Sequence, residues 1–181
     1  NPNIDFALGN FLHTKMHLCI WDNLSIHLKE IQEKVISREK AIGPFSLLAL
    51  IDDPELQKIA ADTYISEMHP KIQYLSKLKI NSKYKKIRVG YFSADFREHP
   101  VSALTVELYE SHNRDKFEIY AFSFGPDTKD EMNLRIKAGV DHFYDVHTMP
   151  HKDVANLSRS MKIDIAINLG GHTRDSRTGI F

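Results

Sequence analysis

The chain has 181 residues, enough for one substantial hydrophobic core or two small ones. Apolar residues make up 42% and charged residues 27%, which are ordinary globular values that argue against disorder. The formal net charge is zero and no block of lysine and arginine stands out, so neither a nucleic acid nor an anionic membrane is expected as the main partner.

Residues 1 to about 80 carry apolar positions at helical spacing. One stripe runs from Phe11 to Cys19 and a second from Leu24 to Ile36. A third helix is expected to open at Asp53-Pro54, because an aspartate cap followed by proline is typical of a helix start, and to end at Pro70. Helix pairs of this kind resemble tetratricopeptide repeats, but no 34-residue period recurs, so an ordinary helical subdomain remains the alternative.

A basic, polar stretch at residues 76–86 is predicted to be a linker. We therefore expect an all-α, tetratricopeptide-like helical segment at residues 1–82 and a second domain at residues 83–181. A disulfide within the chain is excluded, because Cys19 is the only cysteine, and this fits a reducing, cytoplasmic location. No apolar run approaches the ~20 residues of a membrane span.

From residue 85 onward, strands and helices alternate. Strands are predicted at residues 87–93, 117–124, 143–146 and 163–169, with helices at 101–111, 130–138 and 151–161. In the first of these helices, Leu104, Val106 and Leu108 are expected to face inward. Such alternation predicts a Rossmann-like α/β fold with a parallel sheet and right-handed crossovers. Because no G-x-G-x-x-G follows the first strand, a dinucleotide is not expected there.

The loop after the first predicted strand carries Asp95 and His99, followed by Pro100, which suits a first helical position. Open α/β folds bind ligands at the carboxyl ends of their strands, and an acid beside an imidazole can handle protons. The alternative is purely structural: Asp95 caps the turn and His99 takes the place of a helix N-cap. No third ligand lies near the helical His13–His17 pair, so no metal site is predicted.

The last predicted strand is followed by a second polar turn. Gly170 and Gly171 would let backbone approach a ligand closely, although a plain tight turn fits equally well. His172 follows them, and Thr173 offers a hydroxyl that suits a sugar or an acceptor backbone. Since the first and last strands are expected to be neighbours, both turns should open at the same edge of the sheet.

Two segments together resemble the O-linked N-acetylglucosamine transferases. Residues 93–100 match a pattern S-x-D-F-x-x-H-P after a V-G-Y strand, and residues 163–177 resemble the family's later strand and its G-[YH]-T-x-x-x-R turn. The spacing between the two also resembles the family, and the likeness runs from about Asn10 to Phe181. Either motif alone is a weak signal, and the pair is fairly specific.

This resemblance implies one half of a two-lobed (GT-B) glycosyltransferase that moves a sugar from a UDP-sugar to serine or threonine of a protein. It places Asp95 and His99 in the catalytic cleft as the expected catalytic residues, with Pro100, Gly171, His172 and Thr173 as expected substrate contacts. No cofactor besides the donor is implied, and the donor nucleotide is expected mainly on a second lobe. The chain stops at Gly179-Ile180-Phe181, so we expect a truncated protein that is inactive alone.

Several positions depart from the animal pattern. Val101 and Ala103 stand where threonine and histidine are common, and His172 stands where tyrosine is common. These departures resemble a bacterial branch and leave N-acetylglucosamine, fucose and glucose open as donor sugars. Two other classes remain as alternatives. One is a helical-repeat and Rossmann-like module that only binds a partner. The other is a receiver-like signalling domain, which is disfavoured because no acidic pair follows the first predicted strand.

Overall fold

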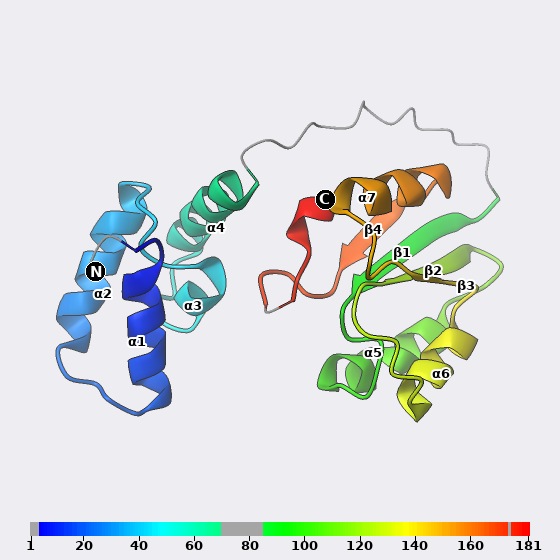
Figure 1. Cartoon of the computed structure of the whole chain (residues 1–181), viewed down its shortest axis with the longest axis horizontal. Helices are drawn as coiled ribbons and strands as arrows, with labels where there is room; N and C mark the ends of the chain where they lie inside the picture. Colours follow the sequence, from blue (N-terminus) through cyan, green and yellow to red (C-terminus); the bar gives the residue numbers. More distant parts are fainter. Residues whose placement is uncertain (1–3, 70–84, 174) are drawn as a thin grey trace. The chain divides into compact units, whose positions relative to one another are not determined.

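The computed structural model describes residues 4–69, 85–173 and 175–181. The chain divides into two compact units, Asn1–Tyr74 and Leu75–Phe181 (Figure 1). The expected linker and the domain boundary near residue 82 lie largely or wholly outside the described residues. Among the described helices, none is both long and apolar enough to span a membrane.

The first unit is entirely helical. Its elements are α1 (Ala7–His17), α2 (Leu24–Ile36), the short α3 (Pro44–Leu48) and α4 (Pro54–Met68). They enclose a small core whose fully buried side chains include Leu12, Ile31, Val35 and Leu47. Because the bundle is small, only part of each predicted apolar stripe is buried: Phe11, Leu18, Ile26 and Ile36 remain exposed. The tetratricopeptide relationship stays a prediction.

Local chemistry explains where α4, which the sequence predicted as the third helix, begins. The Asp53 side chain accepts hydrogen bonds from the backbone N–H groups of Glu55 and Leu56, at 2.9 and 3.1 Å, which satisfies two donors that a helix start leaves unpaired. Pro54 occupies the first helical position, as expected. This helix start was therefore predictable from three residues.

The second unit contains a four-stranded parallel sheet in the order β3-β2-β1-β4. The strands are β1 (Ile87–Ser93), β2 (Phe117–Ser123), β3 (His142–Asp145) and β4 (Ile165–Asn168). The chain runs outward from β1 to β3 and then crosses back to place β4 on the other side of β1. The predicted α/β Rossmann-like fold is confirmed, and so is the expected pairing of the first and last strands.

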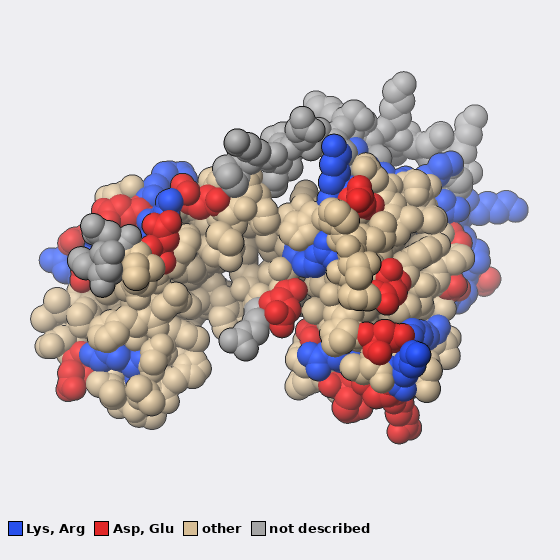
Figure 2. Space-filling model, viewed as in Figure 1, with Lys and Arg blue, Asp and Glu red and all other residues tan. Residues whose placement is uncertain are grey.

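Helices cover both faces of this sheet. The elements α5 (Pro100–Ser111) and α6 (Glu131–Gly139) lie on one face and α7 (His151–Ser160) on the other (Figure 1). Val106, Tyr109 and Ile136 pack in the core of the first face, whereas Val154 packs in the second. Their buried apolar side chains hold the sheet between two layers. On the face shown in Figure 2, both units carry acidic as well as basic side chains.

The inward face of α5 differs from the predicted one. Val106 is 2% exposed, as expected, but Leu104 is 85% and Leu108 47% exposed, so the expectation for both leucines was wrong. The helix packs through Ser102, Val106 and Tyr109 instead. These positions form an i, i+4, i+7 stripe, and the two leucines lie on another side of the helix.

The observed orientation of α5 predicts a contrast between two substitutions on this helix. Val106→Ala should lower the free energy of unfolding by about 1–3 kcal/mol, because it removes buried methyl groups from the core. Leu104→Ala should change it by less than about 0.5 kcal/mol, since little of that side chain is buried. Urea unfolding of both variants gives the comparison, and a larger loss for Leu104→Ala would contradict the orientation of α5.

Candidate functional site

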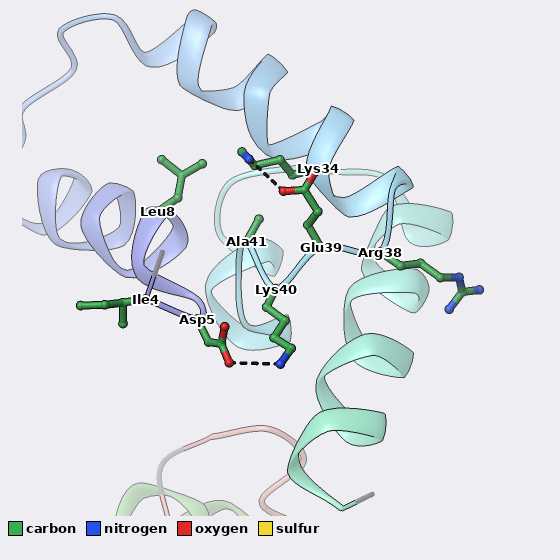
Figure 3. Close-up of a pocket in the computed structure, with 8 residues that line it drawn as sticks. All are labelled: Ile4, Asp5, Leu8, Lys34, Arg38, Glu39, Lys40 and Ala41. Atoms are coloured by element: carbon green, nitrogen blue, oxygen red, sulfur yellow. Dashed lines mark hydrogen bonds and ion pairs between the residues drawn. The ribbon is translucent and has the colours of Figure 1, made fainter. Parts of the chain in front are cut away.

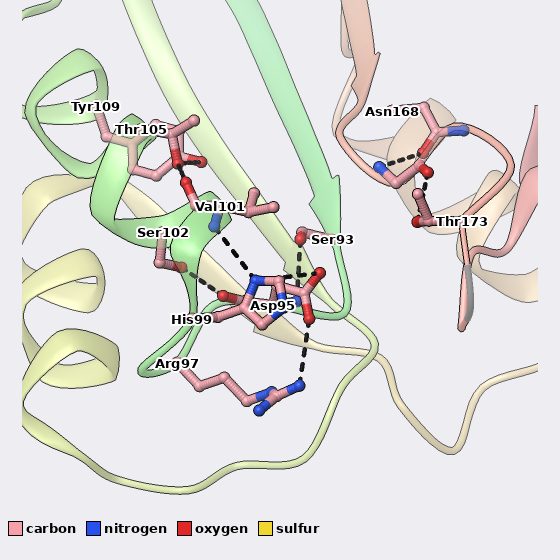
Figure 4. A network of polar contacts seen from close by, with 11 residues as sticks. Ser93, Asp95, Arg97, His99, Val101, Ser102, Thr105, Tyr109, Asn168 and Thr173 are labelled. Atoms are coloured by element: carbon pink, nitrogen blue, oxygen red, sulfur yellow. Dashed lines mark hydrogen bonds and ion pairs between the residues drawn. The ribbon is translucent and has the colours of Figure 1, made fainter. Parts of the chain in front are cut away.

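The carboxyl edge of the sheet places the two predicted polar turns together. Strand order reverses between β1 and β4, and such a switch point is where open α/β sheets bind their ligands. Phe92 pairs with Asn168, so the loops that follow the two strands leave the edge side by side (Figure 4). Asp95 and His99 belong to one loop and the turn from Gly170 to Thr173 to the other. Arg174 lies outside the described residues.

The backbone of the loop after β1 is fixed by two buried serines. The Asp95 N–H donates to Ser93 Oγ at 3.0 Å, and the Ser102 hydroxyl donates to the Asp95 carbonyl oxygen (Figure 4). Ser93 and Ser102 are each 1% exposed. The first anchors Asp95 to the end of β1 and the second anchors it to α5, so the position of Asp95 is set from both sides.

The Asp95 carboxylate lies between a guanidinium and an imidazole. Arg97 Nη2 donates to Asp95 Oδ1 at 3.3 Å, and Asp95 Oδ2 lies 3.7 Å from His99 Nδ1. The side chains of Asp95 and His99 are 20% and 33% exposed, so both are partly sheltered yet open to a ligand. The structure therefore brings the two predicted catalytic residues together on one short loop, where they are four positions apart in the sequence.

His99 also begins helix α5. Its Nδ1 accepts a hydrogen bond from the Val101 N–H at 3.2 Å, and Pro100, which is exposed, takes the first helical position. The structural alternative for His99 is thus correct: it is the N-cap. Because Nδ1 accepts in this arrangement, a neutral ring carries its proton on Nε2 and offers that N–H as a donor.

The turn after β4 is held by its own polar groups. Asn168 Oδ1 accepts from the N–H groups of Gly170 and Gly171, at 3.0 and 3.2 Å. The Thr173 hydroxyl donates to the Gly170 carbonyl oxygen at 2.6 Å (Figure 4). These donors are therefore engaged within the turn, and the Thr173 oxygen keeps its capacity to accept a hydrogen bond. Gly171 has φ +52°, a left-handed conformation that glycine adopts without strain.

His172 lies on the same turn and is partly buried. Burial lowers its pKa below the ordinary value of an imidazole, because the charged form loses hydration. The lowered pKa favours the neutral form of the His172 imidazole at pH 7.

Sequence reasoning missed four residues that shape this site. Ser93 and Ser102 each make one hydrogen bond to the backbone of the loop after β1, and Asn168 accepts two from the backbone of the turn after β4. Arg97 pairs with Asp95. Only Asn168 had a readable signal, because an asparagine two residues before a Gly-Gly pair is typical of a side chain that closes a turn. The other three contacts depend on the conformation of the loop that joins β1 to α5.

A hollow of about 450 Å³ lies in the helical unit (Figure 3). Its polar lining is largely satisfied internally: Lys34 pairs with Glu39 at 2.9 Å, and Lys40 pairs with Asp5 at 3.2 Å. Nothing in its lining matches the predicted catalytic chemistry. Among the described residues there is no group of three or more histidine, cysteine, aspartate or glutamate side chains that could hold a metal ion.

Comparison with protein families matches residues 58–181 to Glycosyl transferase family 41. This range contains the whole sheet unit and both polar turns.

Individual relatives also bear the names of glycosyltransferases. The chain is 31% identical to the probable UDP-N-acetylglucosamine–peptide N-acetylglucosaminyltransferase SEC of Arabidopsis thaliana, over 94% of this chain and 19% of that protein. It is 28% identical to the UDP-N-acetylglucosamine–peptide N-acetylglucosaminyltransferase of Caenorhabditis elegans, over 54% of this chain and 8% of that one. The chain thus spans less than a fifth of the length of these relatives.

Among solved structures, a mutant of the O-GlcNAc transferase of Thermobaculum terrenum superimposes with a TM-score of 0.63. The match covers 93% of this chain and 33% of that one, at 21% sequence identity. At this identity the likeness shows a shared fold.

Proposed function

The chain belongs to glycosyl transferase family 41, and from this membership we propose that it is part of a peptide O-glycosyltransferase, which moves a sugar from a UDP-sugar to a serine or threonine hydroxyl of a protein. One observation carries the proposal: within the family-matched region, Asp95 and His99 lie beside the turn at Gly170–Thr173 where the strand order reverses. That edge is one wall of the cleft in which we place the reaction.

The reaction replaces the diphosphate on the sugar C1 with the acceptor hydroxyl oxygen. The hydroxyl must lose a proton, and the leaving diphosphate must be stabilised by positive charge or N–H donors. When Nδ1 of His99 accepts from Val101, the ring can donate from Nε2 to an oxygen of the donor or acceptor. When Nδ1 carries the proton and faces Asp95 Oδ2, Nε2 can instead accept the proton of the hydroxyl.

Asp95 then has one of two roles. It orients the His99 ring and stabilises its positive charge, or it takes the proton itself, directly or through a water. The turn after β4 is held by its own hydrogen bonds, so Gly171, His172 and Thr173 form one side of the proposed cleft. There the Thr173 hydroxyl oxygen accepts a hydrogen bond from the sugar or the peptide. Pro100 is exposed beside His99 and offers an apolar contact.

We take N-acetylglucosamine as the donor sugar, because that is the sugar in the names of the curated relatives. The donor nucleotide is held mainly by a second lobe, and no cofactor is used besides the donor. The acceptor is a protein or peptide, and the reaction takes place in the cytoplasm. Residues 1–181 alone are expected to bind a UDP-sugar only very weakly.

A screen of nucleotide sugars on the full-length gene product tests this proposal. Hydrolysis and transfer to a serine- or threonine-containing peptide library are measured with UDP-N-acetylglucosamine, UDP-glucose and GDP-fucose. We expect UDP-N-acetylglucosamine to be consumed and peptide to gain one sugar per hydroxyl. No turnover of any donor would favour the alternative, a module that only binds proteins, and tight UDP-sugar binding by residues 1–181 in calorimetry would contradict the second-lobe assignment.

A further inference from the structure

Arg97 occupies a position that the motif S-x-D-F-x-x-H-P leaves open, and it contacts a predicted catalytic residue. The Nη2 atom of Arg97 lies 3.3 Å from Asp95 Oδ1. Among the described residues, the Arg97 side chain donates a hydrogen bond to Asp95 alone. Its Nε is buried and makes no hydrogen bond in the described part of the chain. We propose that Arg97 is a positioning residue, whose guanidinium fixes the Asp95 carboxylate in the orientation that serves His99.

The two carboxylate oxygens have separate partners. Arg97 engages Oδ1, and this leaves Oδ2 facing His99 Nδ1 at 3.7 Å. The last torsion of an aspartate side chain is broad and roughly two-fold, so a carboxylate without a partner on one oxygen samples other orientations. A guanidinium on Oδ1 removes that freedom. It therefore keeps Oδ2 available to orient the ring or to receive its proton.

The loop makes this pairing easy to form and keeps it partly out of water. The Arg97 N–H donates to the Asp95 carbonyl oxygen at 2.7 Å, so the two residues are joined through the backbone as well as the side chains. The side chains of Arg97 and Asp95 are 34% and 20% exposed, which reduces screening compared with a fully solvated pair. Serine anchors on both sides of Asp95 add rigidity.

A competing carboxylate, Asp130, is occupied by other donors. It accepts from the N–H groups of Glu98 and Asn133, at 3.0 and 2.8 Å, and from the Thr128 hydroxyl at 2.5 Å. Arg97 contributes to the lowered pKa of Asp130 only as the last and smallest cause, after these hydrogen bonds. The direct contact of Arg97 is with Asp95, which makes the pairing specific.

This inference rests on the proposed function, and its main test uses the full-length protein with a UDP-sugar and an acceptor peptide. Arg97→Ala should lower kcat about tenfold while KM for the donor changes by less than about twofold, because orientation is lost and ground-state binding is kept. Arg97→Lys should recover to within about threefold of wild type, since an ammonium can still pair with Asp95. The matched control is Arg135→Ala, which breaks the exposed pair with Glu110 (2.8 Å) and should leave kcat unchanged.

A double-mutant cycle separates positioning from any other effect of Arg97. In an Asp95→Asn background, Arg97→Ala should cause no further loss of kcat, because the group it positions is already gone. Additive losses, or a change in KM alone, would overturn the proposal. If the wild-type protein transfers no sugar, the proposed function fails, but thermal unfolding of residues 1–181 still tests the pairing of Arg97 with Asp95. Arg97→Ala should lower the melting temperature in the wild-type background but not in the Asp95→Asn background. Equal shifts in both backgrounds would overturn the proposed pairing.

Discussion

Asp95→Asn and His99→Ala should each lower the turnover of the full-length protein by at least about tenfold, since general acid–base help is worth roughly 10²–10⁴ in rate. The two side chains lie 3.7 Å apart at the edge where the sheet reverses its strand order, so each change removes one member of a coupled pair. Initial rates of sugar transfer to a peptide give the measurement. Circular dichroism of the same preparations shows whether the fold is kept.

The alanine variant of His99 changes two things at once, because the imidazole also caps α5. Loss of a helix cap costs about 1 kcal/mol, and part of the effect on rate would then reflect a frayed helix start. Asparagine is among the best N-cap residues and cannot take a proton at neutral pH. His99→Asn should therefore keep the melting temperature of wild type and still lose the rate, as His99→Ala does.

This comparison decides between two roles for His99. A normal rate in His99→Asn with a low rate in His99→Ala would mean that the histidine matters only as a cap. Wild-type turnover in both Asp95→Asn and His99→Asn would remove the two residues from the mechanism.

Gly125→Ala should destabilise the sheet unit by about 3 kcal/mol and disturb the loop that carries Asp95 and His99. Gly125 follows β2, and a Cβ there would overlap the carbonyl oxygen of Ala94 and lie 2.7 Å from its carbonyl carbon. The obstacle is backbone, which cannot rotate away as a flexible side chain can. Since Ala94 immediately precedes Asp95, any relief of the overlap must shift the loop that carries the candidate catalytic residues.

Urea unfolding of residues 1–181 measures the loss of stability, and the full-length variant shows the loss of rate. Gly139→Ala is a control in the same unit, because a Cβ there meets only the flexible Glu110 side chain, at 3.2 Å from its Cγ. A Gly125→Ala protein with wild-type stability and rate would show that Ala94 and Gly125 do not approach closely in solution.

The sheet unit was largely predictable because its strands are short apolar runs bounded by polar loops. The first strand was predicted at residues 87–93, and β1 has these bounds. The third was displaced by one residue, and the last was predicted two residues too long at its start and one at its end. Ends of strands depend on which backbone groups find a partner, and β4 pairs only over residues 165–168.

Two features could not be obtained from periodicity. The buried face of α5 was assigned to leucines, but the helix lies close to a polar loop, where a small hydroxyl such as Ser102 both fits and bonds to Asp95. The contact of Arg97 with Asp95 arises inside an irregular loop, and no spacing rule predicts which loop side chains turn toward each other. The chemical residues of the site were read from a motif, whereas their supports required coordinates.

Strand β4 forms one border of the sheet, and in the described part of the chain no strand pairs with its outer side. Its backbone N–H and C=O groups on that side form a template to which another extended segment can add. Ile165 is 46% exposed on this strand, so such an addition would also cover apolar surface. Concentrated samples of the 181-residue chain should therefore associate edge to edge through β4, and Ile165→Lys is the substitution that would discourage this association.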